Sequence, residues 1–290
     1  MKNIVLFNDL PGYGRVALSA SVPVLTAMGH RVMNIPTALI SNTLDFGKFE
    51  MLDTTEYMKQ TLQVWEELQF PIDAISAGYI ANQEQAAFLR IFCEKKAKQG
   101  TLVFCDPIMA DHGKLYHGIP VEKVQQMRDL IRNADVCTPN YTEALFLTET
   151  GDYPTAYPMD AVEEHTVFAV VDRLRKLGAK SVIITSVHMK TDDAVQDAVV
   201  GYDALRAEYF QVPFVKRTGV FPGAGDLFSS FMIGKLLEED VKDVWNLQAA
   251  VAYAVKRVSD LIASYEDDME KHHALIECFF SQLCMEDKNA

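Results

Sequence analysis

The chain has 290 residues, of which 49% are hydrophobic and 23% charged, a composition typical of a globular protein with a sizeable core. Its 40 acidic and 27 basic residues give a net charge of −13. This charge argues against nucleic acid and anionic membranes as partners, because both require a basic surface. A protein this acidic has to bind phosphate locally, through backbone N–H groups, a few cations or a metal ion.

In chain order, short apolar runs that predict strands alternate with segments of helical periodicity. The predicted strands are residues 4–7, 32–40, 74–80, 102–105, 136–138 and 181–186, followed by a hairpin of 199–202 and 207–212. The predicted helices are residues 16–28, 54–69, 82–99, 121–133, 140–149, 161–177, 227–239, 242–263 and 269–284. Loops are expected at residues 41–53, 112–120 and 151–158.

This alternation predicts an α/β fold in which one domain, residues 1–290, has a mostly parallel central sheet with helices on both faces. In open parallel sheets, ligands bind beyond the carboxyl ends of the strands. The rule places six polar or glycine-rich segments along one edge of the sheet. They are residues 8–9, 78–79, 106, 138–140, 185–186 and 223–226.

The five cysteines predict neither a disulfide framework nor a metal site, because their number is odd and no pair has C-x-x-C spacing. Cys105 and Cys137 lie in strand-like apolar runs, so we expect buried free thiols, which fit a reducing cytoplasm. The apolar run at residues 4–7 meets polar residues too soon for a signal peptide. No stretch of the sequence approaches the roughly 20 apolar residues of a membrane span. We therefore expect a cytoplasmic protein.

Residues 218–226 are the segment around which we expect the site to form. Gly223, Ala224 and Gly225 make a turn of small residues that opens a helix, where free backbone N–H groups and the helix dipole favour an anion. Asp226 follows, where a carboxylate can accept a proton from a hydroxyl group while the N–H groups hold a phosphoryl group. The alternative interpretation is an ordinary loop whose Asp226 caps the helix.

Two further segments bring oxygen ligands to the same edge. Asp106 and Asp111 follow the predicted strand at 102–105, and Asn140 and Glu143 lie three residues apart on one helical face. Mg²⁺ prefers such oxygen ligands. The alternatives are a capping box for Asn140 and Glu143 and a turn position for Asp106.

Together these motifs resemble those of the ribokinase-like superfamily and, within it, the vitamin kinases that act on pyridoxal and hydroxymethylpyrimidine. The resemblance covers roughly residues 3–260. Its motifs, in the order in which the family has them, are Gly12-Tyr13-Gly14-Arg15, Ser41-Asn42 with Phe46-Gly47, Ser76-Ala77-Gly78-Tyr79, Cys105-Asp106-Pro107-Ile108-Met109, Thr138-Pro139-Asn140 with Thr142-Glu143-Ala144, and Gly223-Ala224-Gly225-Asp226. The resemblance implies the superfamily's three-layer sandwich.

The resemblance also implies roles for individual residues. Asp226 looks like the base that takes the proton of the substrate's hydroxymethyl group, and the N–H groups of Gly223, Ala224 and Gly225 look like the anion hole. The residues that the resemblance assigns to the pyridine ring are Asp9, Thr37, Ser41 and Tyr79. Those that it assigns to ATP are Asp106, Asn140, Glu143, Thr185, Ser186 and Phe221. Those that it assigns to the metal ion are Asp106, Asp111 and Glu143.

The activity implied is ATP-dependent phosphorylation of the 5′-hydroxymethyl group of the B6 vitamers pyridoxal, pyridoxine and pyridoxamine. ATP and Mg²⁺ are the implied cofactors, a monovalent cation is left open, and a homodimer is expected. Asp9 stands where many pyridoxal kinases have Ser, and the family's Ser-Asn-His-Thr run reads Ser41-Asn42-Thr43-Leu44. Two alternatives therefore stay open: a hydroxymethylpyrimidine kinase of thiamin synthesis, and a non-catalytic binder of pyridoxal phosphate, against which the intact Asp226 argues.

Overall fold

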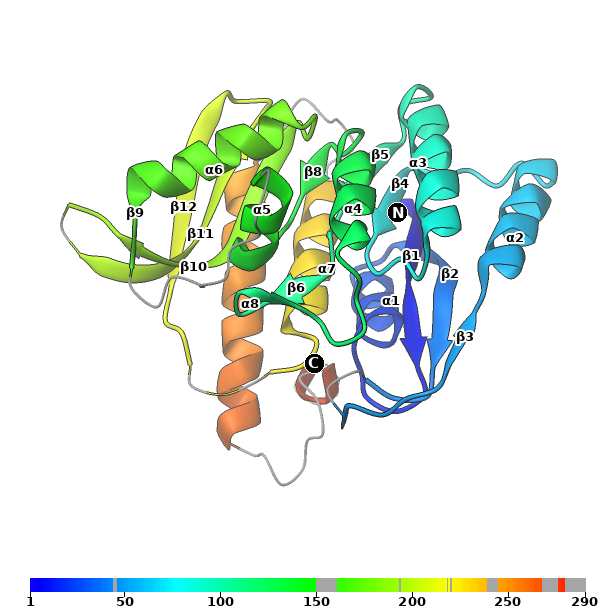
Figure 1. Ribbon diagram of the computed structural model, residues 1–290, viewed down its shortest axis with the longest axis horizontal. Helices are drawn as coiled ribbons and strands as arrows, with labels where there is room; N and C mark the ends of the chain where they lie inside the picture. The colour runs from blue at the N-terminus through cyan, green and yellow to red at the C-terminus, as the bar shows by residue number, and fades with distance from the viewer. Residues whose placement is uncertain are drawn as a thin grey trace, which may run out of the picture.

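A central β-sheet between two layers of helices organises the chain (Figure 1). The computed structural model describes residues 1–43, 46–149, 161–192, 194–217, 219, 221–238, 245–267 and 276–279. The strands of the main sheet are β1 (Asn3–Pro11), β2 (Arg31–Ile40), β3 (Met51–Asp53), β4 (Ala74–Ala77), β5 (Leu102–Cys105), β8 (Val136–Cys137), β9 (Val162–Glu163), β10 (Ser181–Lys190), β11 (Val195–Asp203) and β12 (Glu208–Phe214). The strands β6 (Ala110–Asp111) and β7 (Lys114–Leu115) form a separate small hairpin.

The main sheet is mostly parallel, as the sequence predicts. Its order is β12-β11-β10-β8-β5-β4-β1-β2-β3, with β9 paired to β10. The inner strands from β10 to β2 pair in parallel, whereas β3, β11 and β12 pair antiparallel at the two margins. The carboxyl ends of the parallel strands therefore meet at one edge, toward which the arrowheads of β1 and β2 point in Figure 1.

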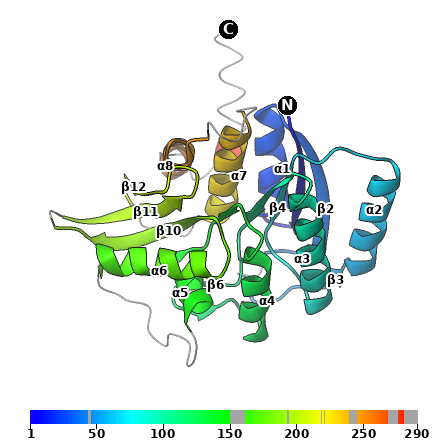
Figure 2. The same cartoon turned by 90° about the horizontal axis from the view of Figure 1, so that it is seen from above.

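Helices cover both faces of the sheet, as Figure 2 shows from above. One face carries α1 (Leu18–Ala27), α7 (Ala224–Leu237) and α8 (Leu247–Asp267). The other carries α2 (Thr55–Glu67), α3 (Gln83–Ala97), α4 (Glu122–Ile131), α5 (Tyr141–Thr148) and α6 (Glu164–Lys176). Each face of the sheet has its own apolar core. The strands between the two cores are therefore buried on both sides, and their sequences are continuous apolar runs.

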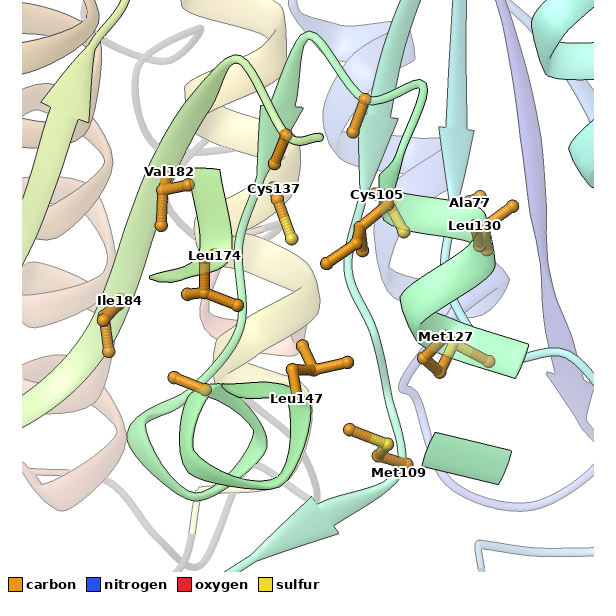
Figure 3. Packing of buried hydrophobic residues seen from close by; sticks show 14 of the residues in the cluster. Ala77, Cys105, Met109, Met127, Leu130, Cys137, Leu147, Leu174, Val182 and Ile184 are labelled. Carbon is orange, nitrogen blue, oxygen red and sulfur yellow. The ribbon is translucent and has the colours of Figure 1, made fainter. Parts of the chain in front are cut away.

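The residues of β1 show this division directly. Val5 and Phe7 pack into the core beneath α2–α6, and Ile4 and Leu6 pack into the core beneath α1, α7 and α8. Figure 3 shows the first core around β5, β8 and β10, where side chains of the strands meet those of the covering helices. The layered α/β fold expected from the sequence is thereby confirmed.

The cysteines in the described part of the chain are buried and free, as predicted. Cys105 and Cys137 lie side by side on neighbouring strands in the core of Figure 3. Burial raises the pKa of the Cys93 thiol to about 12 and those of Cys105 and Cys137 well above the usual range. These thiols are therefore core side chains with little nucleophilic character. The fifth cysteine, Cys284, lies outside the described residues.

Several element boundaries differ from the prediction. The helix expected from residue 161 begins at Glu164, because the two residues before it pair with β10 as β9. The strand expected at 181–186 continues to Lys190 through an irregularity between Ile184 and Val187. The expected loops at 41–53 and 112–120 contain β3 and part of the β6–β7 hairpin.

The long C-terminal helix α8 begins five residues later than expected and ends four residues later. The loop expected at 151–158 and most of the helix expected at 269–284 lie outside the described residues. Across the parts of the chain that the structure describes, no helix has the length and apolar character needed to cross a membrane.

Candidate active site

The first turn of α7 presents Asp226 at the carboxyl edge of the sheet. Gly223 precedes the helix with a φ of 84°, in the left-handed region, and a Cβ on it would lie 3.1 Å from the carbonyl oxygen of Arg15. Glycine is therefore required for the turn. The N–H of Ala224 donates to the Phe221 carbonyl at 3.1 Å. Among the described residues, the N–H of Gly225 has no acceptor, so this group can face an anion.

The carboxylate of Asp226 does not cap its own helix. Its Oδ2 accepts a hydrogen bond from the Ala17 backbone N–H at 2.9 Å, and its Oδ1 accepts one from the Asn8 side-chain amide at 3.4 Å. The alternative in which Asp226 serves as a helix cap is therefore wrong. Burial raises the pKa of Asp226 to about 6, and the two hydrogen bonds oppose that rise.

Asp106 lies close to Asp226, at the end of β5. Its Oδ2 accepts a hydrogen bond from Ser229 Oγ at 3.3 Å, one helical turn after Asp226 in α7. Burial and the nearby Asp226 charge raise the pKa of Asp106. Both carboxylates line one small cavity, together with Asn8 and Gly78. The structure thus brings four of the predicted edge segments to a single point.

Glu143 is 2% exposed and forms the capping box that the sequence left as an alternative. Asn140 and Glu143 exchange hydrogen bonds of 2.9 Å between side chain and backbone. The other oxygen of Glu143 accepts a bond from the Met109 N–H at 3.0 Å. Burial and the Asp106 charge raise the pKa of Glu143 well above the usual range. The capping geometry is confirmed, and it holds a second acidic group beside Asp106.

The three acidic residues assigned to the metal ion, Asp106, Asp111 and Glu143, do not form one ligand cluster among the described residues. Across the described residues, no three His, Cys, Asp or Glu side chains come close enough to hold a metal by themselves. Asp111 accepts a hydrogen bond from the His112 N–H at 2.7 Å, and its side chain is 45% exposed. Mg²⁺ often uses only one or two protein carboxylates and fills its shell with water and phosphate oxygens. Asp106 and Glu143 would suffice.

The four residues assigned to the substrate lie at the ends of β1, β2 and β4. The pKa of Asp9 is raised to about 7 by burial and by the Asp226 charge. Thr37 is fully buried, and its hydroxyl donates to the Tyr79 carbonyl at 2.7 Å. Ser41 is exposed at the rim of an open pocket of about 480 Å³. Thr37 therefore contacts the backbone of Tyr79, and Asp9, the one acidic residue of the four, is close enough to Asp226 for that charge to raise its pKa.

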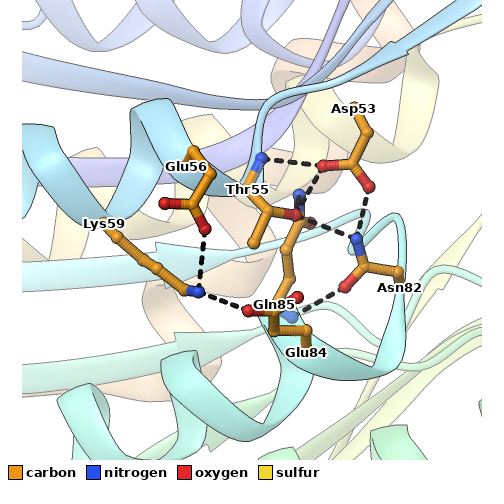
Figure 4. A network of polar contacts seen from close by, with 7 residues as sticks. All are labelled: Asp53, Thr55, Glu56, Lys59, Asn82, Glu84 and Gln85. Atoms are coloured by element: carbon orange, nitrogen blue, oxygen red, sulfur yellow. Dashed lines mark hydrogen bonds and ion pairs between the residues drawn. The ribbon is translucent and has the colours of Figure 1, made fainter.

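A polar network holds the segment after β4 against α2 (Figure 4). Gln85 donates to the Thr37 carbonyl and to the Thr55 hydroxyl, and its side-chain oxygen accepts from the Ala81 N–H. Asn82 caps α3 by accepting from the Gln85 N–H and also donates to Asp53. The network fixes the backbone from which Tyr79 projects.

Of the remaining residues assigned to the nucleotide, Thr185 and Ser186 lie in β10 and Phe221 lies just before α7. Thr185 pairs with Asn140 through an isolated parallel bridge, and its N–H donates to the Pro139 carbonyl at 3.0 Å. Ser186 is exposed, with a φ of 56° at the irregularity in β10. Strained backbone of this kind gathers at ligand sites. Phe221 packs edge-on against Tyr265, with ring centroids 6.1 Å apart.

The sequence placed Asn8 at this edge without a role and gave no indication of three further residues that the structure brings to these segments. Asn8 and Ala17 bind Asp226, and Ser229 binds Asp106. Lys123 is 2% exposed and donates to the Ile80 carbonyl at 2.6 Å, and burial lowers its pKa to about 8. Of these residues, only Asn8 could be linked to the site from the sequence, because it directly follows the apolar run of β1 at the predicted edge.

Comparisons with known proteins find a matching family model, curated relatives and solved structures of similar fold. Residues 17–276 match the model of a family described as phosphomethylpyrimidine kinase. Over 159 residues the chain is 29% identical to the pyridoxal kinase of Dictyostelium discoideum, a match that covers 52% of this chain and 49% of that protein. The chain thus spans about half the length of this curated relative.

Two solved structures resemble the chain over most of its length. The first, from Bacteroides thetaiotaomicron, is a provisionally named phosphomethylpyrimidine kinase in a crystal form with pyridoxal. It is 31% identical, with a TM-score of 0.77, and the match covers 91% of this chain and 86% of that one. The second is pyridoxal kinase from Lactobacillus plantarum, 25% identical with a TM-score of 0.78 and 99% of both chains covered.

Proposed function

Because the chain belongs to the phosphomethylpyrimidine kinase family, we propose that it is an ATP-dependent kinase of vitamin B6 vitamers. It transfers the γ-phosphate of ATP to the 5′-hydroxymethyl group of pyridoxal, pyridoxine or pyridoxamine, in salvage of pyridoxal 5′-phosphate. Two of the similar proteins are named pyridoxal kinases and the crystal form of the third contains pyridoxal, which favours this acceptor over hydroxymethylpyrimidine.

The observation that carries the proposal is the setting of Asp226. Its carboxylate is held by groups outside its own helix, Ala17 N–H and Asn8 Nδ2, at a helix N-terminus and beside Asp106. A base in this position takes the proton of the acceptor hydroxyl as that oxygen forms a bond to the γ-phosphorus. The bond between the γ-phosphorus and the bridging oxygen breaks, and ADP leaves.

The other groups stabilise the charge of the phosphates. The N–H of Gly225 and the dipole of α7 face the phosphoryl group. Asp106 and Glu143 would hold Mg²⁺, which when bound supplies positive charge to the phosphate oxygens. Asp111 stays a proposed further ligand, and a monovalent cation a proposed further ion. Thr185, Ser186 and Phe221 contact the nucleotide in this proposal, and Asp9, Ser41 and Tyr79 the vitamer.

We also propose a homodimer in the cytoplasm, with residues 1–290 forming one domain. Exposed apolar side chains at the β3 margin of the sheet support the dimer, because Leu39, Met51 and Leu52 are 39%, 44% and 62% exposed. A measurement of mass by light scattering after size exclusion tests it, and a monomer at micromolar concentration would contradict it.

An assay of ADP release with ATP and Mg²⁺ tests the activity. The acceptors are pyridoxal, pyridoxine, pyridoxamine and hydroxymethylpyrimidine, each at several concentrations. We expect turnover on the B6 vitamers. Turnover on hydroxymethylpyrimidine alone would instead indicate a kinase of thiamin synthesis. No turnover on any acceptor would favour a non-catalytic binder of pyridoxal phosphate.

A further inference from the structure

The side chain of Asn8 bridges the end of β1 to two other parts of the site. Its Oδ1 accepts hydrogen bonds from the backbone N–H groups of Tyr79, at 2.9 Å, and Asp9, at 3.1 Å. Its Nδ2 lies 3.4 Å from Oδ1 of Asp226. We infer that Asn8 is a positioning residue, which orients the carboxylate of Asp226 toward the acceptor hydroxyl. The inference rests on the proposed function, because it takes Asp226 to be the base.

The hydrogen bonds settle which way the amide of Asn8 faces. Two backbone N–H groups point at one of its terminal atoms, and only the oxygen can accept from them. The NH₂ group must then face Asp226, where it can donate to the carboxylate. A distance of 3.4 Å is at the long end for a hydrogen bond, and such bonds in ligand-free active sites often shorten once substrate is bound.

Gly78 provides an independent sign that the position of Asn8 matters. A Cβ on Gly78 would lie 2.7, 2.8 and 2.9 Å from Nδ2, Cγ and Oδ1 of Asn8. Real Cβ atoms do not come this close to other heavy atoms, so any side chain at position 78 would displace the amide. Asn8 itself is 8% exposed, which leaves the amide little room to move elsewhere.

Together, Asn8 and Ala17 hold the two oxygens of Asp226 from different sides. A carboxylate held by two donors keeps one orientation, and a fixed orientation is what a general base needs to meet a hydroxyl at hydrogen-bond distance. A purely structural role is the competing interpretation: Asn8 would only satisfy the Tyr79 and Asp9 N–H groups and so stabilise the junction of β1 and β4.

The variant Asn8→Asp separates the two roles. It keeps an oxygen for both backbone N–H groups but replaces the donor that faces Asp226 with a second acceptor. Asn34→Asp, at an exposed position of β2, is the matched control for the added charge. Asn8→Ala and Gly78→Ala displace or remove the amide by other routes, in case the first variant folds poorly.

The measurement is kcat and KM for ATP and pyridoxal across pH 5–9, together with Tm. We expect Asn8→Asp to lower kcat on the order of 10²-fold, with KM for ATP changed less than about threefold, and to move the acid limb of the kcat profile to higher pH. Asn34→Asp should behave as wild type. Wild-type kcat and an unmoved acid limb for Asn8→Asp would overturn the inference.

A second readout does not depend on the acceptor. In ligand-free protein labelled with ¹³C in aspartate side chains, Asp226→Asn identifies the signal of Asp226, and its titration can be followed by NMR. Asn8→Ala should raise the titration midpoint of Asp226 by about half a pH unit or more, because it removes a donor to the charged form. No shift would refute the role of Asn8, whereas wild-type inactivity toward all B6 vitamers would refute only the proposed function.

Discussion

The backbone N–H of Ala17 donates a hydrogen bond to the carboxylate of Asp226, 2.9 Å away in space and 209 residues away in the sequence. Ala17 has a φ of 50° and a ψ of −127°, values that a residue with a Cβ rarely adopts. The start of α1 is thus held in an unfavourable conformation that aims an N–H at the proposed base. Strain of this kind persists where surrounding structure enforces it.

Asp226→Asn should abolish most activity and leave the fold intact. Asparagine keeps an oxygen that can accept from the Ala17 N–H, but it cannot take a proton from the acceptor. We expect kcat with pyridoxal to fall on the order of 10²–10⁴-fold, the usual size of a general-base contribution. Asp129→Asn, on the exposed side of α4, is the control. A variant with more than about a tenth of the wild-type rate would remove Asp226 from the role of base.

The wild-type rate should rise with pH through the pKa of Asp226. Burial places this pKa at about 6, and a base must be unprotonated to act. We therefore expect kcat/KM, which reports the pKa of the free enzyme, to increase from pH 5 to pH 7 with a midpoint near 6, measured in one buffer series. A profile that is flat across this range would contradict the assignment.

The ligand-free protein should lose stability as the pH rises. The pKa values of Asp9 and Asp226 are raised to about 7 and about 6, so each group binds its proton more tightly in the folded state than in the unfolded state. The stability that results is fully present below the unfolded value, roughly 4, and is lost as the pH passes through the folded value. Urea unfolding at pH 5 and pH 8 measures this, and we expect the larger free energy of unfolding at pH 5.

Asp106→Asn should stabilise the ligand-free protein while lowering its activity. The substitution removes a buried charge that lies beside Asp226 and Glu143, whose pKa values are raised by burial and, for Glu143, by Asp106 itself. We expect the free energy of unfolding to increase on the order of 1–2 kcal/mol at pH 8, which corresponds to a rise of a few degrees in Tm. The gain should shrink at pH 5, where the carboxyl group is protonated. A lower Tm at pH 8 would contradict this.

Gly223→Ala should damage the turn before α7. The residue has a φ of 84°, and its new Cβ would lie 3.1 Å from the Arg15 carbonyl oxygen. We expect the free energy of unfolding to fall by about 1–2 kcal/mol. We also expect kcat to fall, because the turn positions the N–H groups that bind the anion. Gly225→Ala is the comparison for stability, since a Cβ there meets no heavy atom within 4 Å. Equal Tm losses for the two variants would count against the geometric argument.

Thr37→Val tests the support of Tyr79. Valine matches the shape of threonine but cannot donate to the Tyr79 carbonyl, which would stay buried without that bond. We expect a loss of about 1–2 kcal/mol and a higher KM for the vitamer, measured by thermal unfolding and kinetics. Thr26→Val, whose hydroxyl bonds to Val22 within an exposed helix turn, should change neither. An unchanged KM for Thr37→Val would leave Thr37 with a structural role alone.

The sequence by itself determined the layered α/β fold and the edge at which the site lies. Apolar runs such as residues 102–105 are buried on both faces, and local turn chemistry at Gly223 starts the helix α7. Parallel strands must return to the same end, so polar residues that follow them, such as Asp106, gather at one edge whatever their separation in the chain.

Only the tertiary structure decided which groups hold Asp226. Ala17 N–H is a backbone donor, invisible to any pattern of side chains, and Asn8 reaches Asp226 because β1 lies next to β4 and α1 packs against α7. Periodicity and turn signals report interactions close in sequence, whereas these contacts depend on how elements far apart in the chain pack together.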